Sequence, residues 1–288
     1  MIFKANASIN LALDVGERGE NGYHDVDLIS IPLDLHDIIE VRAIVGSRDT
    51  YLTEDDPTLI CEETEMAYRA FAELRKRFKL NRGIRIQIYK RIPSEAGLGG
   101  GYADAACLIR ALCYTYRIPL DNPMVQEVCQ QVGAGVNLAM AKIAARATGS
   151  REIVEPLNDL DLRYGVLLVK PREGIDTKTI YERYDQIPPQ MRHHPNIAAL
   201  LNALRSNDEE AIATNMGNSL LAPAIEMCPE IRTILDMMHE MGLHLNNMSS
   251  SGSACFCLAH DKRKLKEARE AFDRAGYATL LTSTVLKR

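Results

Sequence analysis

A run of glycines separates a predicted strand from a predicted helix and could hold a phosphate group. The strand is expected at residues 84–92, where isoleucines alternate, and the helix follows the glycines, where apolar residues recur at helical spacing from 105 to 113. Glycine lets a main chain approach a ligand closely, and the first-turn N–H groups of a helix have no intrahelical partner. The segment is neither a Walker A loop nor a dinucleotide-binding fingerprint. On its own, such a cluster indicates a phosphate site and a tight turn with positive φ about equally well.

The elements expected around this loop divide the chain into two parts. The first part alternates predicted strands and helices, and residues 151–163 then form an acidic, proline-containing stretch before a new buried strand. We therefore predict an α+β fold with two domains, residues 1–155 and residues 156–288. Predicted strands span 8–15, 36–44, 84–92, 164–170, 244–248, 254–259 and 277–287, and further predicted helices span 64–78, 177–185, 196–217, 230–241 and 261–275.

Composition and charge indicate a globular protein that does not hold a partner through a large excess of basic surface charge. A hydrophobic content of 46% and a charged content of 25% exclude a disordered chain, and the formal net charge of −5 argues against nucleic acid or an anionic membrane as partner. No apolar run approaches the roughly 20 residues needed to span a bilayer. We therefore expect a cytoplasmic protein with a small-molecule ligand, and leave its oligomeric state open.

Neither the cysteines nor the histidines have the spacing of a metal site. The seven cysteines are scattered without a Cys-x-x-Cys pair, which predicts reduced, mostly buried thiols. Cys255 and Cys257 alternate, as two side chains on one face of a buried strand would. His193 and His194 lie in a proline-flanked loop, where we expect a solvated surface pair.

Three motifs in order resemble those of the GHMP kinases. Residues 92–112 resemble the family's Pro-x-x-x-Gly-Leu-Gly-Gly-Gly loop, residues 6–13 its Ala-Lys-Ile-Asn-Leu strand, and residues 248–256 its carboxy-terminal glycine motif. The resemblance implies a GHMP-kinase-type two-domain fold, with a β-rich amino-terminal nucleotide and catalytic domain and a two-layer α/β carboxy-terminal domain. It implies ATP and Mg²⁺ as cofactors. The nucleotide-binding positions that it gives are Pro93, Gly97, Leu98, Gly99, Gly100, Gly101, Tyr102, Ala103 and Asp104.

Residues 21–41 resemble one branch of that family, the 4-diphosphocytidyl-2-C-methyl-D-erythritol kinases. These enzymes of the non-mevalonate isoprenoid pathway phosphorylate the 2-hydroxyl of a cytidine diphosphate-linked polyol. The resemblance implies that Tyr23 stacks on the cytosine ring, that His24 reads the edge of the base, and that Tyr181 supplies the opposite wall. Taken singly, Tyr23 is more typical of a half-buried turn aromatic and His24 of a hydrogen-bonded turn histidine; the surrounding motif favours the cytosine site.

The sequence departs from the family at the positions that carry the chemistry. Ser8 stands at the catalytic lysine and Gly135 at the catalytic aspartate, whereas Asn10 is retained. Tyr102 and Ala103 stand where the family has a hydroxyl beside Mg²⁺ and phosphate. The chain is therefore expected to be either an impaired kinase or one that uses substitute residues.

Three questions about the site and its function stay open. Lys142 is a better candidate substitute for the missing lysine than Lys4, although a solvated lysine is the favoured interpretation. Ser250 stands at a glycine position of the last motif, where a Cβ atom could obstruct a close backbone approach. The alternative function is a non-catalytic paralogue that binds a cytidine ligand or a protein partner on the kinase scaffold, so whether the chain is an enzyme is left open.

Overall fold

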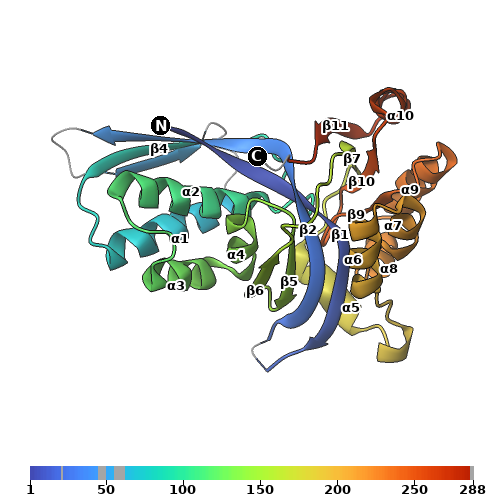
Figure 1. Cartoon of the computed structure of the whole chain (residues 1–288), viewed down its shortest axis with the longest axis horizontal. Helices are drawn as coiled ribbons and strands as arrows, with labels where there is room; N and C mark the ends of the chain where they lie inside the picture. Colours follow the sequence, from blue (N-terminus) through green and yellow to red (C-terminus); the bar gives the residue numbers. More distant parts are fainter. Residues whose placement is uncertain (21, 45–49, 55–61, 286–288) are drawn as a thin grey trace. The chain divides into compact units, whose positions relative to one another are not determined.

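The computed structural model describes residues 1–20, 22–44, 50–54 and 62–285. The chain forms two compact units, each built from separate segments. The first unit comprises Met1–Ala7, Leu35–Pro93 and Gly99–Lys142, and the second comprises Ser8–Asp34, Ser94–Leu98 and Ile143–Arg288. Two long strands, β1 (Ile2–Arg18) and β2 (His24–Ile44), contribute to both units (Figure 1). The predicted domain boundary after residue 155 stays a prediction.

In its described residues, the first unit combines strands with four helices. Strand β4 (Gly83–Tyr89) pairs antiparallel with the second half of β2 and parallel with β3 (Thr50–Glu54). The isoleucines that alternate along β4 are buried, as their spacing predicts. The helices are α1 (Glu62–Arg77), α2 (Gly100–Tyr116), α3 (Pro123–Val132) and α4 (Ala134–Met140).

Helix α2 is the central helix of this unit. It contacts α1, α3 and α4, and its alanines and leucines are buried around most of its circumference. A helix that is apolar on nearly all sides belongs in a core, and alanine favours the helical conformation. The glycine-rich loop therefore leads directly into the most buried helix of the unit.

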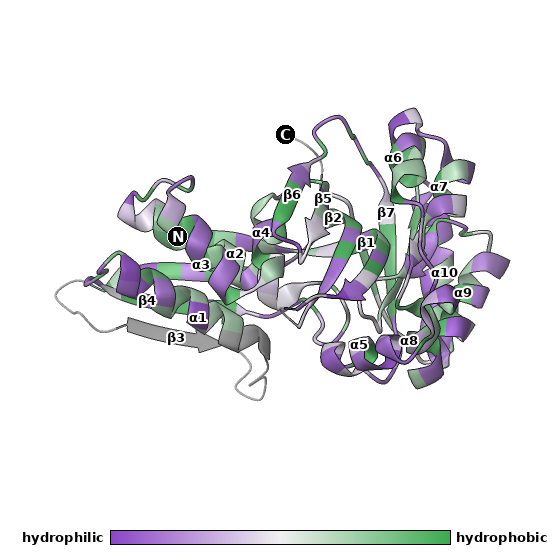
Figure 2. Ribbon diagram, turned by 90° about the horizontal axis from the view of Figure 1, so that it is seen from below, coloured by the Kyte–Doolittle hydropathy of each residue, from purple (hydrophilic) through white to green (hydrophobic). Residues whose placement is uncertain are grey.

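The second unit contains a four-stranded antiparallel sheet in the order β11–β7–β10–β9. Strand β7 is largely hydrophobic (Figure 2), and Cys255 and Cys257 are buried on β10, as predicted. Around it the chain forms β5 (Ala145–Gly149), β6 (Ile153–Pro156), β7 (Gly165–Lys170), α5 (Thr177–Asp185), a 3₁₀ turn (Pro189–Met191), α6 (Ile197–Ser206), α7 (Glu209–Asn215), β8 (Gly217–Asn218), α8 (Leu221–Met227), α9 (Glu230–Glu240), β9 (Asn246–Met248), β10 (Cys255–Ala259), α10 (Lys262–Arg274) and β11 (Ala278–Ser283).

The first strand also contributes to this unit through a long-range pairing. Strand β8 pairs parallel with β1, aligning Gly217 with Ala12. Strand β5 pairs with β2 and with β6. The unit therefore joins the beginning of the chain to segments from its second half.

The helical pattern predicted near 196–217 corresponds to two helices, α6 and α7, rather than to one continuous helix. Helix α6 ends at Asn207, which has φ 52°, and α7 begins after Asp208, whose carboxylate accepts a hydrogen bond from Ala211 N. Asparagine in the left-handed region ends helices, and aspartate caps their amino termini. Across the described ranges, none of the helices is long and apolar enough to cross a lipid bilayer.

Candidate functional site

The glycine-rich loop has the backbone conformation that its sequence requires. Gly97 has φ 67° and Gly99 has φ 69°, both in the left-handed region that favours glycine. A Cβ atom on Gly97 would overlap the carbonyl oxygen of Ser249, so only glycine fits there. Gly99 is the N-cap of α2, and no side chain of the described residues caps that helix. The loop thus combines positive φ with a helix start whose N–H groups could meet an anion, and phosphate binding stays a prediction.

Residues Ser94–Leu98 of the loop lie in the second unit, where the turn that follows β9 holds them. Ser249 Oγ donates to the Gly97 carbonyl over 2.8 Å. Ser250, at the family's glycine position, has φ 49°, so it takes the left-handed conformation despite its Cβ atom. Such a conformation costs of order 1–3 kcal/mol for a residue other than glycine. The serine is therefore tolerated at this turn with local backbone strain.

Tyr102 lies over the residue at the family's aspartate position. A Cβ atom added to Gly135 would stand 2.7 Å from Cδ2, 2.8 Å from Cγ and 2.9 Å from Cε2 of the Tyr102 ring. Gly135 is the second residue of α4, and its φ lies outside the left-handed region, so glycine is not required there by backbone conformation. The two departures at 102 and 135 are therefore sterically linked, because the ring occupies the space that an aspartate side chain would need.

Asp104, the fifth residue of α2, belongs to a buried ion-paired cluster. Lys90 Nζ lies 2.6 Å from Asp104 Oδ2 and 2.6 Å from Asp37 Oδ2, and all three side chains are buried. Asp37 Oδ1 also accepts a hydrogen bond of 2.8 Å from Ile92 N. This cluster ties the start of α2 to β2 and to the segment that enters the glycine loop.

The residues at the start of α2 fit a magnesium ion poorly. Mg²⁺ prefers oxygen ligands, but the first turn of α2 carries no acidic side chain, and the carboxylate that follows it, that of Asp104, is paired with Lys90. Position 103 is alanine, and position 102 carries the tyrosine ring described above. Among the residues that the structure describes, no group of three or more His, Cys, Asp or Glu side chains could hold a metal ion.

The remaining nucleotide and catalytic positions are placed as follows. Ser8 and Asn10 alternate on β1, so their side chains share one face of that strand, with Asn10 buried and Ser8 half-buried. Ser8 N donates to the Leu98 carbonyl over 3.0 Å. Leu98, Gly100, Gly101, Ala103 and Asp104 are buried, whereas Pro93, Gly97, Gly99 and Tyr102 are half-buried.

Lys142 follows the end of α4 in an uncommon conformation, with φ 58°. Partial burial, and after it the positive charge of Arg110, lower the pKa of the Lys142 amine. Arg110 itself donates to the Ala139 carbonyl over 3.1 Å, near the end of the same helix. The positive charge of Lys142 is therefore repelled by that of Arg110. The role of Lys142 as a substitute for the missing lysine stays a prediction.

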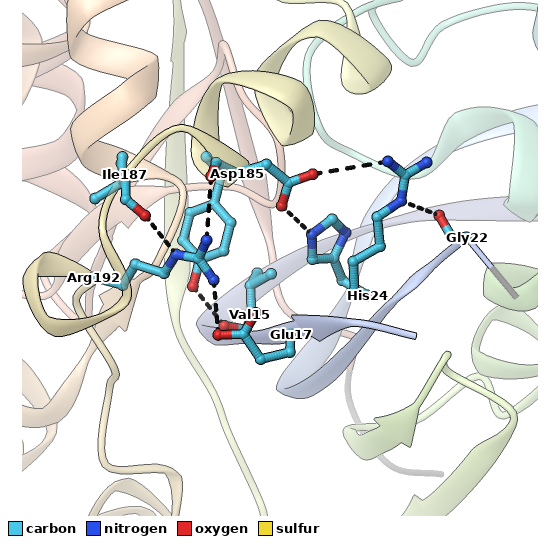
Figure 3. A network of polar contacts seen from close by, with 9 residues as sticks. Val15, Glu17, Gly22, His24, Asp185, Ile187 and Arg192 are labelled. Atoms are coloured by element: carbon cyan, nitrogen blue, oxygen red, sulfur yellow. Dashed lines mark hydrogen bonds and ion pairs between the residues drawn. The ribbon is translucent and has the colours of Figure 1, made fainter. Parts of the chain in front are cut away.

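His24, one of the predicted cytosine-binding residues, forms part of a polar network in the second unit (Figure 3). Tyr23 is 70% exposed, which suits a stacking surface, whereas His24 is buried. His24 Nε2 lies 2.7 Å from Asp185 Oδ1, and its ring centroid lies 5.1 Å from that of Tyr181 at an angle of 36°. The structure brings His24 and Tyr181 together; the binding of cytosine by these residues stays a prediction.

Asp185 was not among the site residues predicted from the sequence. It stands four residues after Tyr181 on α5, a spacing that puts both side chains on one helix face. That spacing was the available signal. The exposed pair His193 and His194 matches its prediction, although His194 Nδ1 lies 2.7 Å from Asp14 Oδ1.

Comparisons with known proteins agree with the family resemblance that the sequence motifs indicate. The model of the GHMP kinases N terminal domain matches residues 65–150, and that of GHMP kinases C terminal matches residues 188–278. The chain is 31% identical over 284 residues to the 4-diphosphocytidyl-2-C-methyl-D-erythritol kinase of Caldicellulosiruptor bescii, covering 99% of this chain and 98% of that protein. It is 32% identical over 264 residues to the kinase of the same name from Exiguobacterium sibiricum, covering 91% of each.

Solved structures give the same result. A crystal structure of 4-(cytidine 5'-diphospho)-2C-methyl-D-erythritol kinase is similar with a TM-score of 0.81 and 29% identity, covering 99% of each chain. Homoserine kinase from Cytophaga hutchinsonii has a TM-score of 0.73 at 14% identity, a likeness of fold alone. The predicted two-domain fold class is confirmed.

Proposed function

Because the chain belongs to the 4-diphosphocytidyl-2-C-methyl-D-erythritol kinases of the GHMP kinase family, we propose that it binds ATP and a cytidine diphosphate-linked polyol. The proposed reaction is transfer of the γ-phosphoryl group of ATP to the 2-hydroxyl of that polyol. Family membership supports ATP as the phosphoryl donor and a small molecule as the acceptor. The observation that carries the proposal is the glycine loop, with positive φ at Gly97 and Gly99 and a start of α2 that no described side chain caps.

The phosphate groups would be held by main-chain N–H groups of the loop and of the first turn of α2. Backbone donors need no particular side chain, so this part of the site tolerates the substitutions at 102 and 103. The cytosine base would be held by Tyr23, His24 and Tyr181, since aromatic stacking contributes about 1–3 kcal/mol per base. Mg²⁺, if bound, would neutralise phosphate charge, with most of its ligands coming from phosphate and water.

Catalysis by this chain should be slow. Phosphoryl transfer depends on positioning and on charge stabilisation rather than on covalent chemistry by the protein. Ser8 provides no positive charge, and Gly135 provides no carboxylate to orient or deprotonate the acceptor hydroxyl. Loss of a general base typically removes about 10²–10⁴ in rate. We therefore propose an impaired kinase.

One observation favours the second candidate, a non-catalytic protein that binds a cytidine ligand. The Tyr102 ring lies against Gly135, where the family's catalytic carboxylate would stand. In this chain the catalytic carboxylate is absent, and the aromatic ring also occupies the space that the carboxylate would need.

A coupled ADP-release assay with the cytidine diphosphate-linked polyol separates the two candidates. Calorimetry with ATP and with the polyol, each alone, accompanies it, and the Caldicellulosiruptor bescii enzyme serves as positive control. Slow turnover that needs both ligands supports the impaired kinase. Polyol binding without any ADP release supports the binding protein, and binding of neither ligand would refute both.

A further inference from the structure

Asp185 connects three segments of the second unit around His24, the residue predicted to bind the edge of cytosine. Its Oδ1 atom lies 2.7 Å from His24 Nε2, and its Oδ2 atom lies 4.0 Å from Arg18 Nη1. Arg18 Nε in turn donates to the Gly22 carbonyl over 2.9 Å. Figure 3 shows this chain of contacts from Asp185 to the turn before His24. One carboxylate therefore holds the histidine ring directly and the turn that precedes it through Arg18.

The place of Asp185 in its helix is unfavourable for α5 itself. It is the last residue of that helix, where the carbonyl groups give the helix dipole its negative end. A negative side chain is disfavoured at that end, and residues that break such a local rule are often kept for a site. The contacts with His24 and Arg18 provide the compensating interactions.

The carboxylate decides which nitrogen of His24 carries the proton. An ionised carboxylate can only accept hydrogen bonds, so His24 Nε2 must be the donor at 2.7 Å. In a neutral ring the other nitrogen, Nδ1, is then an acceptor. Within the described part of the chain, Nδ1 makes no hydrogen bond. The ring is also held by Tyr181, and Tyr184 meets its edge with centroids 6.1 Å apart.

We propose that Asp185 is a positioning residue, which holds His24 in the Nε2–H tautomer so that Nδ1 accepts a hydrogen bond from the exocyclic amine of cytosine. Uracil has a carbonyl oxygen in place of that amine, so an acceptor would face an acceptor. An unsatisfied polar contact of this kind disfavours the wrong base. The inference rests on the proposed function, because it concerns the same base-binding residues.

The test compares Asp185→Ala, which leaves no acceptor for His24 Nε2, with the matched control Glu182→Ala on the same helix. Glu182 is exposed, and its only ion pair in the described structure is with Lys178 at 3.8 Å. The ¹⁵N signals of the imidazole rings report the tautomer of each histidine, and a His24→Gln variant assigns the signals of His24. Calorimetry then gives the affinities for cytidine 5'-diphosphate and uridine 5'-diphosphate.

We expect the wild-type protein and Glu182→Ala to show His24 protonated on Nε2 and to prefer the cytidine nucleotide. In Asp185→Ala, which removes the acceptor, the tautomer signals should change, and the preference should fall about tenfold, as expected for one hydrogen bond. A wild-type His24 protonated on Nδ1 would overturn the proposal without any variant. So would an Asp185→Ala protein that keeps both tautomer and preference. If neither nucleotide binds, the proposed cytosine site is wrong. The His24 tautomer is measured without ligand, so that measurement still tests the role of Asp185 separately from the proposed function.

Discussion

Alanine at position 135 should destabilise the protein only while Tyr102 is present. The added Cβ atom would stand 2.7–2.9 Å from three atoms of the tyrosine ring, against ordinary contacts of 3.4–4 Å. One of the three atoms is Cγ, which a rotation about χ2 does not move, so the whole ring or the backbone must shift. Overpacking of this kind costs about 1–3 kcal/mol.

The effect of alanine at position 135 on the free energy of unfolding should change sign once the Tyr102 ring is removed. Gly135 lies inside α4 with φ outside the left-handed region, so alanine fits the backbone there. In a helix, alanine is favoured over glycine by roughly 0.5–1 kcal/mol. Gly135→Ala should therefore stabilise a Tyr102→Ser protein by about that amount, while it destabilises the parent by up to about 2 kcal/mol after the same gain is subtracted.

Urea unfolding of the parent, both single variants and the double variant measures this coupling. The interaction free energy between positions 102 and 135 should be about 1–3 kcal/mol, well above the roughly 0.3–0.5 kcal/mol within which independent sites add. An equal effect of Gly135→Ala in both backgrounds would refute the reasoning. It would mean that the ring does not occupy the space beside Gly135.

Three further predictions follow from the same residues and their partners. Ser8→Lys with Gly135→Asp should raise turnover little while Tyr102 remains, whereas adding Tyr102→Ser should raise it about 10²–10⁴-fold in the ADP-release assay; a parent already at ordinary kinase rates, with no gain in the triple variant, would contradict this. Tyr23→Ala should weaken cytidine diphosphate binding by about 1–3 kcal/mol in calorimetry, without lowering the melting temperature, because Tyr23 is 70% exposed; an unchanged affinity would remove Tyr23 from the site. Lys90→Met should destabilise the protein by about 3–5 kcal/mol in urea, because it leaves two buried carboxylates without their cation; an unchanged unfolding midpoint would show that the pair does not depend on Lys90.

Local signals account for the parts of the fold that the sequence predicted. The alternating isoleucines of β4, the glycines that lead into α2 and the alternating cysteines of β10 each depend on neighbours within a few residues. Helix α3 carried a signal of the same kind, since Asn122 caps it and proline occupies its first position, yet it was not predicted.

The contacts that define the candidate site are long-range, and spacing alone does not reveal them. The Tyr102 ring against Gly135 joins two helices, and the bond between His24 and Asp185 joins residues 161 positions apart. Motif comparison identified Gly135 and His24 individually. It gave no indication that the first had lost its space or that the second had a carboxylate partner.

The pairing of β8 with β1 affects how the protein folds on the ribosome. The residues of β1 near Ala12 gain their partner at Gly217, which is synthesised about 200 residues later. Because synthesis proceeds at about 5–20 residues per second, the edge of the apolar first strand stays unpaired for roughly 10–40 s before β8 is made. Ser249, which holds the glycine loop, emerges later still. Nascent chains should therefore expose an unpaired strand edge for most of translation, and premature termination should yield products prone to aggregation.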